Sequence, residues 1–370
     1  MPSLAYLDWN ATAPLRAEAA AAMADALRRT GNPSSVHRWG RAARQAIERA
    51  RAQVADLVGA ARAEVIFTSG GTEANHLALG GVPARRILMS AIEHDSVREA
   101  VPEATVIPVT PAGVVDLAAL DALLADDARP ALVSIMLANN ETGAIQPIAE
   151  AAAIAHRQGA LFHCDAIQGA GKLPVDIRAL GVDLLSISAH KLGGPQGVGA
   201  LVARDGVALT ALQRGGGQER GRRAGTENGP GIVGFGVAAE LAKPESLSNA
   251  GIAELRDAAE TALAQAAPDA RVFAKETPRL PNTLCIGMPG VAASTQVMAL
   301  DLAGVMVSAG AACSSGKVRR SHVLSAMGAS SDEAESAIRV SLGWSTTAAE
   351  IEQLVDAWVA LYRRTRSAAA

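Results

Sequence analysis

Short apolar runs alternate with amphipathic, alanine-rich segments through the first two thirds of the chain. The apolar runs have the length and the β-branched content of buried strands, and they lie at residues 64–68, 86–89, 105–109, 131–136, 160–163, 184–187 and 198–202. Helical spacing is found between them, at residues 17–29, 36–58, 116–124 and 148–157. Continuously apolar strands that alternate with helices predict an α/β fold with a mostly parallel sheet, covered by helices on both faces.

After residue 243 the pattern changes. A long helical segment at 249–266 is followed by short strand-like runs, a second helix, a glycine- and serine-rich loop, an apolar strand at 338–342 and a last helix from residue 347. This is typical of a smaller α+β unit. We therefore expect a large domain over residues 15–243 and a small domain that combines residues 1–14 and 244–370.

Composition restricts the classes of function. Of the 370 residues 49% are hydrophobic, which is enough for a sizeable core, and the net charge of −3 gives no electrostatic reason to expect nucleic acid or an anionic membrane as partner. Three cysteines are too few and too scattered for a disulfide framework. Neither a signal peptide nor an apolar run of membrane-spanning length is evident. We expect a soluble, cytoplasmic protein.

Two apolar strands are followed by residues that suit a pyridoxal phosphate (PLP) site. Lys191 lies just past one strand, between Ser188, His190 and a glycine-rich run, and Asp165 ends the strand before it. Such a site needs an amine for the Schiff base, a carboxylate that keeps the pyridine nitrogen protonated, and small or hydroxyl side chains around the phosphate. Gln168 could donate to the phenolate oxygen of the ring. The order of these residues predicts PLP binding.

Two motifs in the first hundred residues could complete that site. Residues 69–75 join a strand to a helix, where backbone N–H groups favour a phosphate and the Thr72 hydroxyl adds a donor. The alternative is an ordinary helix cap with glycine in the turn. His94 follows another strand and could stack on a planar cofactor and relay protons, although a histidine at a helix start is more often a cap or a surface residue. A Walker A pattern is not present.

A metal site at His163, Cys164 and Asp165 is a competing interpretation. Adjacent strand residues point to opposite faces, so three consecutive ligands converge poorly on one ion. We therefore expect no metal.

Three features of the second half allow both a functional and a structural interpretation. The segment 214–228, which includes Thr226, is rich in glycine and charge and is either a flexible surface loop or an ordered anion-contacting loop near a subunit interface. Cys313 lies among small residues with basic residues nearby, the setting of a candidate nucleophile, whereas Cys164 and Cys285 lie in apolar strands. Arg339 inside an apolar strand could bind an amino-acid carboxylate or form a structural salt bridge.

Taken in order, these motifs resemble the cysteine desulfurases of the NifS/IscS kind, within the class V aminotransferase group of PLP enzymes. The likeness runs from residues 6–14 through 31–37, 69–75, 139–143 and the Asp165 and Lys191 segments to the Cys313 loop and Arg339. It implies PLP fold type I with a seven-stranded type of large-domain sheet.

The resemblance also implies a role for each matching residue. Lys191 would be the Schiff-base lysine, and His94 would stack on the ring. Asn140 and Arg339 would orient the substrate, and Cys313 would carry the persulfide. The cofactor-binding residues would be Gly71, Thr72, His94, Asn140, Asp165, Gln168, Ser188, His190, Lys191 and, from the other subunit of a homodimer, Thr226.

The implied activity is removal of sulfur from L-cysteine. It would give L-alanine and a persulfide whose sulfur passes to an acceptor such as an iron–sulfur cluster scaffold. Selenocysteine lyase, cystine lyase and a true aminotransferase are the alternatives within the group. A sulfur-transfer scaffold or regulatory subunit with idle PLP chemistry is the alternative from another class.

Overall fold

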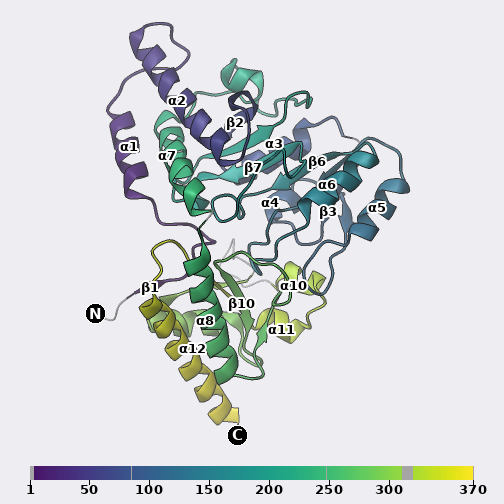
Figure 1. The fold of residues 1–370 in the computed structure, drawn as a ribbon, viewed down its shortest axis with the longest axis vertical. Helices are drawn as coiled ribbons and strands as arrows, with labels where there is room; N and C mark the ends of the chain where they lie inside the picture. Colours follow the sequence, from purple (N-terminus) through teal and green to yellow (C-terminus); the bar gives the residue numbers. More distant parts are fainter. Residues whose placement is uncertain (1–3, 85, 247, 311–319, 370) are drawn as a thin grey trace.

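The computed structural model describes residues 4–84, 86–246, 248–310 and 320–369. Figure 1 shows a broad upper part built on one sheet and a smaller lower part that contains both marked chain ends. None of the helices in these residues combines the length and the apolar character needed to cross a membrane.

A seven-stranded sheet is the centre of the upper part. Its order is β2-β8-β7-β6-β5-β3-β4, and β8 runs antiparallel to both neighbours while the other neighbouring pairs are parallel. The predicted mostly parallel sheet is therefore confirmed. The strands are β2 (Val65–Thr68), β3 (Arg86–Ser90), β4 (Thr105–Ile107), β5 (Ala131–Ser134), β6 (Leu161–Asp165), β7 (Leu184–Ser188) and β8 (Gly199–Ala203).

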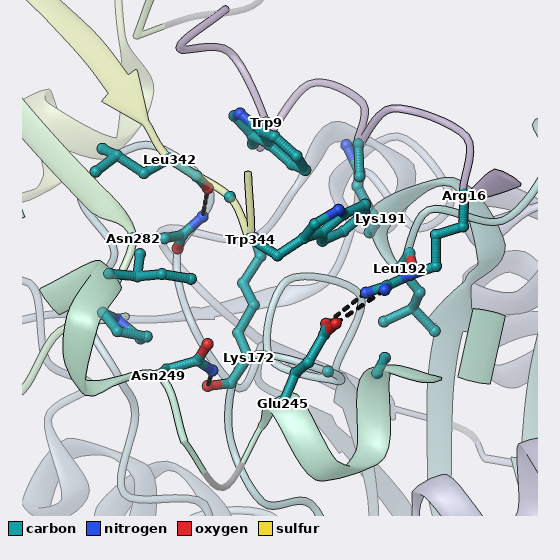
Figure 2. Close-up of a pocket in the computed structure, with 16 residues that line it drawn as sticks. Trp9, Arg16, Lys172, Lys191, Leu192, Glu245, Asn249, Asn282, Leu342 and Trp344 are labelled. Atoms are coloured by element: carbon teal, nitrogen blue, oxygen red, sulfur yellow. Dashed lines mark hydrogen bonds and ion pairs between the residues drawn. The ribbon is translucent and has the colours of Figure 1, made fainter. Parts of the chain in front are cut away.

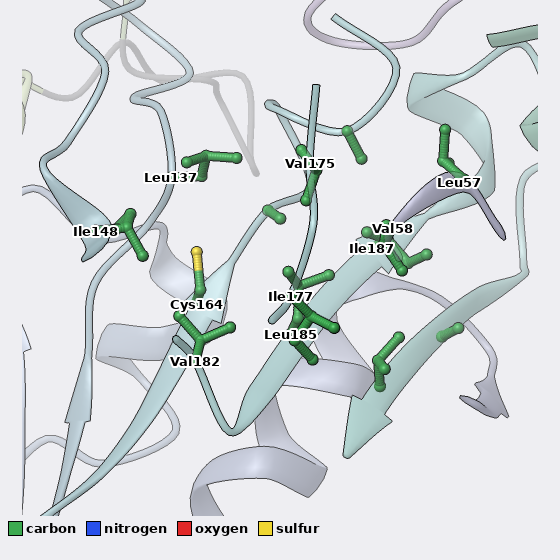
Figure 3. Packing of buried hydrophobic residues seen from close by; sticks show 14 of the residues in the cluster. Leu57, Val58, Leu137, Ile148, Cys164, Val175, Ile177, Val182, Leu185 and Ile187 are labelled. Carbon is green, nitrogen blue, oxygen red and sulfur yellow. The ribbon is translucent and has the colours of Figure 1, made fainter. Parts of the chain in front are cut away.

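Helices cover both faces of this sheet because its strands are apolar on both sides. They are α1 (Ala17–Leu27), α2 (Arg38–Leu57), α3 (Gly71–Gly81), α4 (Asp95–Arg98), α5 (Leu117–Ala125), α6 (Ile148–Arg157) and α7 (Gly229–Glu245). Phe67 and Leu185 pack in one core with residues of α2, α5, α6 and α7, whereas Ile66 and Leu184 pack on the other face with α3. Figure 3 shows Leu185, Ile187 and Cys164 within the first of these cores.

Helix α7 is an element that the periodicity of the sequence did not predict. It carries glycines where it crosses α2, and a Cβ atom on Gly236 would lie 2.6 Å from Ala50 Cα. The glycine thus allows α7 and α2 to approach closely. Because α7 is buried around much of its circumference, its sequence does not show the alternation of one apolar and one polar face that predicts a surface helix.

The lower part has its own sheet and core. A four-stranded sheet has the order β12-β13-β10-β9, and β1 pairs in parallel with β11. Its strands are β1 (Ala5–Tyr6), β9 (Arg271–Val272), β10 (Thr283–Gly287), β11 (Val305–Met306), β12 (Ser308–Ala309) and β13 (Ala337–Ser341). Its helices are α8 (Ala250–Ala266), α9 (Ala293–Leu302), α10 (His322–Ala326), α11 (Ser331–Glu335) and α12 (Ala348–Ala369).

The N-terminal segment joins the two parts. Leu7 packs in the apolar core of the lower part, and Asp8 forms a parallel bridge with Ser341, the last residue of β13. Farther along the same segment, Ala13 N–H donates to the His190 carbonyl of the upper part over 2.8 Å. The division into residues 15–243 against 1–14 with 244–370 stays a prediction.

Candidate active site

Asp165 and Lys191 lie at the same edge of the large sheet. Asp165 is the last residue of β6, and Lys191 ends a single 3-10 turn (Ala189–Lys191) that follows β7 directly. Strands β6 and β7 are parallel neighbours, with Asp165 opposite Ser186. Ligand sites of open α/β sheets form at this carboxyl edge.

The carboxylate of Asp165 is buried, with 5% of the residue exposed. Its Oδ2 accepts a hydrogen bond from Asn75 Nδ2 over 2.8 Å, and its Oδ1 accepts one from the Ile167 backbone N–H over 3.0 Å. Burial raises the pKa of Asp165, while His94, these two hydrogen bonds and Lys191 act in the opposite direction. A buried carboxylate whose hydrogen-bond donors are neutral can still form an ion pair with a cation, such as a protonated pyridine nitrogen.

Asn75 and Ser96 connect Asp165 with His94 through a chain of hydrogen bonds. Asn75 Nδ2 also donates to Ser96 Oγ over 2.8 Å, and Ser96 Oγ lies 2.9 Å from His94 Nδ1. His94 is exposed and is the N-cap of α4, because its Nδ1 accepts from the Ser96 backbone N–H over 3.0 Å. In the neutral ring the proton is therefore on Nε2. The cap interpretation of His94 is confirmed, and its catalytic role stays a prediction.

The amine of Lys191 is held by the N-terminal segment. Nζ donates to the backbone carbonyls of Asn10 and Ala11 over 2.5 and 2.7 Å. Burial and, after it, the charge of Arg339 lower the pKa of Lys191 to about 8. Figure 2 shows Lys191 on the wall of a small pocket of about 40 Å³, together with Trp9, Lys172 and Trp344. An amine of lowered pKa on a pocket wall is suited to nucleophilic and proton-transfer chemistry.

The two residues predicted to flank the lysine have different surroundings. Ser188 is buried at the end of β7. His190 Nδ1 lies 3.1 Å from Thr12 Oγ1, and burial followed by the charge of Lys191 lowers the pKa of His190 to about 4. His190 is therefore neutral at physiological pH.

Gln168 is held by a network that the sequence did not reveal. Its Nε2 donates to the Asn10 carbonyl over 2.9 Å, and its Oε1 accepts from Lys172 Nζ over 2.7 Å. Lys172 Nζ also donates to Asn10 Oδ1 over 2.7 Å. No role was predicted for Asn10 or Lys172, because the contacts of Asn10 with Gln168 and Lys172 join segments far apart in the chain.

Arg339 forms the salt bridge that was one of its two predicted roles. Its Nη2 lies 2.8 Å from Asp8 Oδ1, and its Nη1 donates to the Asn140 carbonyl over 3.2 Å. Its Nε is buried and has no hydrogen-bond partner among the described residues. The guanidinium thus keeps a free donor beside Asn140, and its substrate-binding role stays a prediction.

The start of α3 is suited to an anion. Gly70 is the N-cap and supplies no side chain, and a Cβ atom there would meet no atom within 4 Å in the described part of the chain. Gly71 is buried against Ile167, whereas the next residue, Thr72, is exposed at the helix start. Open first-turn N–H groups and a free hydroxyl match the needs of a phosphate. Together with Asp165 and Lys191, these residues fit PLP.

The glycine-rich segment 214–228 is anchored by a buried ion pair. Glu219 accepts from Arg51 Nη1 and Nη2 over 2.6 and 2.8 Å and from the Phe67 backbone N–H over 2.9 Å. The expected flexible-loop alternative is therefore wrong at Glu219. Thr226 is exposed and lines a groove of about 810 Å³ between α1, α2 and α7, apart from the pocket of Lys191.

Cys313 lies outside the described residues. Cys164 and Cys285 are buried, and burial raises the pKa of both thiols, so they are inert small hydrophobes as expected. His163 has both ring nitrogens 2.9 Å from hydroxyls, those of Ser134 and Ser186, and burial lowers the pKa of His163 to about 3. Because Cys164 points into the apolar core (Figure 3) while His163 bonds to these serines, the two side chains do not converge on one ion.

A seven-stranded, mostly parallel sheet with an aspartate and a lysine side by side at its carboxyl edge defines the class of α/β proteins with PLP fold type I. The aminotransferase class-V family matches residues 5–354. The chain belongs to this family.

Individual relatives agree with this assignment. A cysteine desulfurase of Cereibacter sphaeroides is 48% identical over 366 residues, which cover 95% of this chain and 94% of the relative. A NifS-like protein from Rickettsia africae ESF-5 superposes with a TM-score of 0.91 at 38% identity, covering 97% of this chain and 99% of that one. A structure of SspA in complex with cysteine has a TM-score of 0.78 at 30% identity, covering 91% and 98% of the two chains.

Proposed function

We propose that this protein is a PLP-dependent cysteine desulfurase that converts L-cysteine to L-alanine and a persulfide on Cys313. The observation that carries the proposal is the pair formed by Asp165 at the end of β6 and Lys191 after β7. It lies in a chain whose family match spans residues 5–354 and whose similar relatives include cysteine desulfurases.

The cofactor would be held at three places. Lys191 would attach it covalently, and Asp165 would pair with its pyridine nitrogen. Its phosphate would be held by Gly71, Thr72, Ser188 and His190. When bound, PLP supplies an electron sink that stabilises negative charge at the Cα atom of an amino acid.

Residues of this chain would then position cysteine and move its protons. Arg339 Nε, which has no partner among the described residues, and Asn140 would face the substrate carboxylate. Lys191 Nζ would take the Cα proton, a step favoured by its lowered pKa of about 8, because part of the amine population is neutral near pH 7. His94 would donate or accept at Nε2, since its Nδ1 is occupied by Ser96.

Sulfur transfer would take place on Cys313. The Cys313 thiolate attacks the sulfur of cysteine, a sulfur–sulfur bond forms as the carbon–sulfur bond breaks, and the three-carbon product is protonated to alanine. Over the whole reaction, one thiol and one L-cysteine give one persulfide and one L-alanine. The persulfide sulfur would pass to an acceptor such as an iron–sulfur cluster scaffold.

The direct test combines spectroscopy with product analysis. Purified protein loaded with PLP is mixed with L-cysteine and a reductant, and visible absorption, alanine, sulfide and pyruvate are measured in the same sample. A shifted absorption band with equal amounts of alanine and sulfide supports the proposal. Pyruvate, or turnover with selenocysteine or cystine in place of cysteine, would move the function to another activity of the family.

A cysteine series tests the nucleophile. C313S should abolish alanine release from cysteine while cofactor binding is kept. C285A is the matched control, because Cys285 is a buried thiol whose pKa is raised by burial. Full activity of C313S, or equal loss in C285A, would reject Cys313 as the persulfide carrier.

We further propose that two copies form a homodimer across the α1–α2–α7 groove. The groove is lined by apolar side chains that include Leu27 and Trp39, which are 70% and 61% exposed. Exposed apolar side chains of this size are typical of an interface. Thr226 lies on the same groove, which supports its predicted contribution to the partner's phosphate site.

Mixed dimers test that contribution. In a dimer of one K191A subunit and one T226A subunit, the T226A subunit keeps its own lysine and would receive Thr226 from its partner. One site should then bind the cofactor as tightly as the unsubstituted protein does. If Thr226 serves its own subunit, that site should be as weak as in a T226A homodimer.

A further inference from the structure

Lys172 places a second amine beside the Lys191 pocket. Its Nζ lies 2.7 Å from Gln168 Oε1 and 2.7 Å from Asn10 Oδ1. Figure 2 shows Lys172 and Lys191 on the wall of the same pocket. Within the described residues no ion pair joins Lys172 to a carboxylate, so its described side-chain partners are these two amides.

The orientation of both amides is determined by their surroundings. Gln168 Nε2 faces a backbone carbonyl, that of Asn10, which can only accept, so Oε1 must face Lys172. Asn10 Nδ2 faces the Asn140 carbonyl over 3.3 Å and Thr283 Oγ1 over 2.9 Å, so its Oδ1 must face Lys172 as well. Lys172 donates to both oxygens, and Asn282 Nδ2 is a second donor to Asn10 Oδ1 over 3.1 Å.

Asn10 then connects this amine with the residues predicted to contact the cofactor and the substrate. Its backbone carbonyl accepts from Lys191 Nζ and from Gln168 Nε2. Its side-chain amide donates to the Asn140 carbonyl, which also accepts from Arg339 Nη1. Asn10 is 1% exposed, so an unsatisfied amide atom at this position would cost free energy.

We propose that Lys172 is a positioning residue. By donating to Gln168 Oε1, it keeps Gln168 Nε2 at the Asn10 carbonyl and leaves the second N–H of Nε2 to donate to the cofactor. The inference rests on the proposed function, because Gln168 matters to the reaction through a hydrogen bond to the cofactor. Lys172 itself touches neither cofactor nor substrate.

A double-mutant cycle tests this role with a readout other than turnover. K172M, Q168A and K172M/Q168A are prepared without cofactor, and PLP is titrated into each while its dissociation constant is measured. K172M and Q168A should each bind roughly 10-fold more weakly, the effect of about one hydrogen bond. The double variant should be within about 2-fold of Q168A, because Lys172 acts through Gln168.

Two further variants define the controls. K275M removes an exposed lysine and should leave PLP binding unchanged. K172Q keeps a side-chain donor without the charge. The increase in the logarithm of its PLP dissociation constant should be at most half of the increase seen in K172M. Cooperative thermal unfolding of each variant verifies that it is folded.

The outcomes separate the two proposals. Unchanged PLP affinity in K172M, or effects of K172M and Q168A that simply add, would overturn the positioning role while the desulfurase proposal stands. Failure of the unsubstituted protein to bind PLP would overturn the proposed function itself. The apparent pKa seen in a pH titration of the bound cofactor's absorption should rise in K172M, since both the oriented donor and a nearby amine are lost.

Discussion

Asn75 donates a hydrogen bond of 2.8 Å to the buried carboxylate of Asp165. The donor is a neutral amide on α3, so it stabilises the ionised carboxylate without neutralising its charge. Asn75 Oδ1 has no partner within the described residues. The side chain therefore serves Asp165 and Ser96 through a single nitrogen atom.

Replacing Asn75 should weaken cofactor binding. N75A removes a donor from a carboxylate whose pKa burial already raises, so the pKa of Asp165 should rise further and PLP should bind about 5- to 10-fold more weakly near pH 7. Titration of the apoprotein with PLP measures this. H76A, at the exposed next position of α3, should have no effect; equal losses in the two variants would indicate a general weakening of the helix.

Removing the Lys191 amine should stabilise the apoprotein at neutral pH. The pKa of Lys191 is lowered to about 8 in the folded state, so between about pH 8 and pH 10.4 the unfolded state binds more protons and stability rises with pH. At pH 7 the free-energy cost of burying the charged amine is fully present and amounts to about 3 kcal/mol. K191M should therefore unfold at a higher temperature than the unsubstituted apoprotein at pH 7. The difference should shrink as the pH approaches 10.5, and a difference independent of pH would contradict the lowered pKa.

Breaking the Arg51–Glu219 pair should destabilise the fold. R51M leaves the buried Glu219 charge without its partner and should lower the free energy of unfolding by about 3–5 kcal/mol, and E219L should cost less because Arg51 keeps its ion pair with Glu48. Urea unfolding measures this, and the double variant should be less destabilised than the sum of the two. R28A, in an exposed pair with Asp25, should change stability by less than about 1 kcal/mol. Similar losses in R28A and R51M would argue against burial as the cause.

Gly343 is required by close packing against an aromatic ring. A Cβ atom at this position would lie 2.0 Å from Trp9 Cε3, so G343A should destabilise the protein by about 1–3 kcal/mol and displace Trp9 from Trp344. Thermal unfolding and tryptophan fluorescence report the two effects. G251A, where a Cβ atom would meet no described atom within 4 Å, should be neutral or slightly stabilising, because Gly251 lies in helix α8.

The strands of the large sheet, and the two polar residues Asp165, at the end of β6, and Lys191, just after β7, could be predicted because the sequence patterns that mark them are local. Apolar runs mark β6 and β7, and Asp165 and Lys191 follow them within a few residues. Helix α7 could not be predicted, since its glycines pack against other helices and erase the amphipathic stripe. Asn10 was missed because a single polar residue gains its role from partners in segments that come together after folding.

The same residue also determines when the site can be completed. Asn10 N–H bonds to Ser341 Oγ across 331 positions of the chain, and its side chain contacts Asn282 and Thr283. At a synthesis rate of about 5–20 residues per second, Asn10 is made roughly 17–66 seconds before Ser341. The contacts of Asn10 with the lower sheet can therefore form only after β10 and β13 have been made, whereas Gln168 and Lys191 can bind its carbonyl earlier, so the lower sheet completes a contact that the large sheet begins.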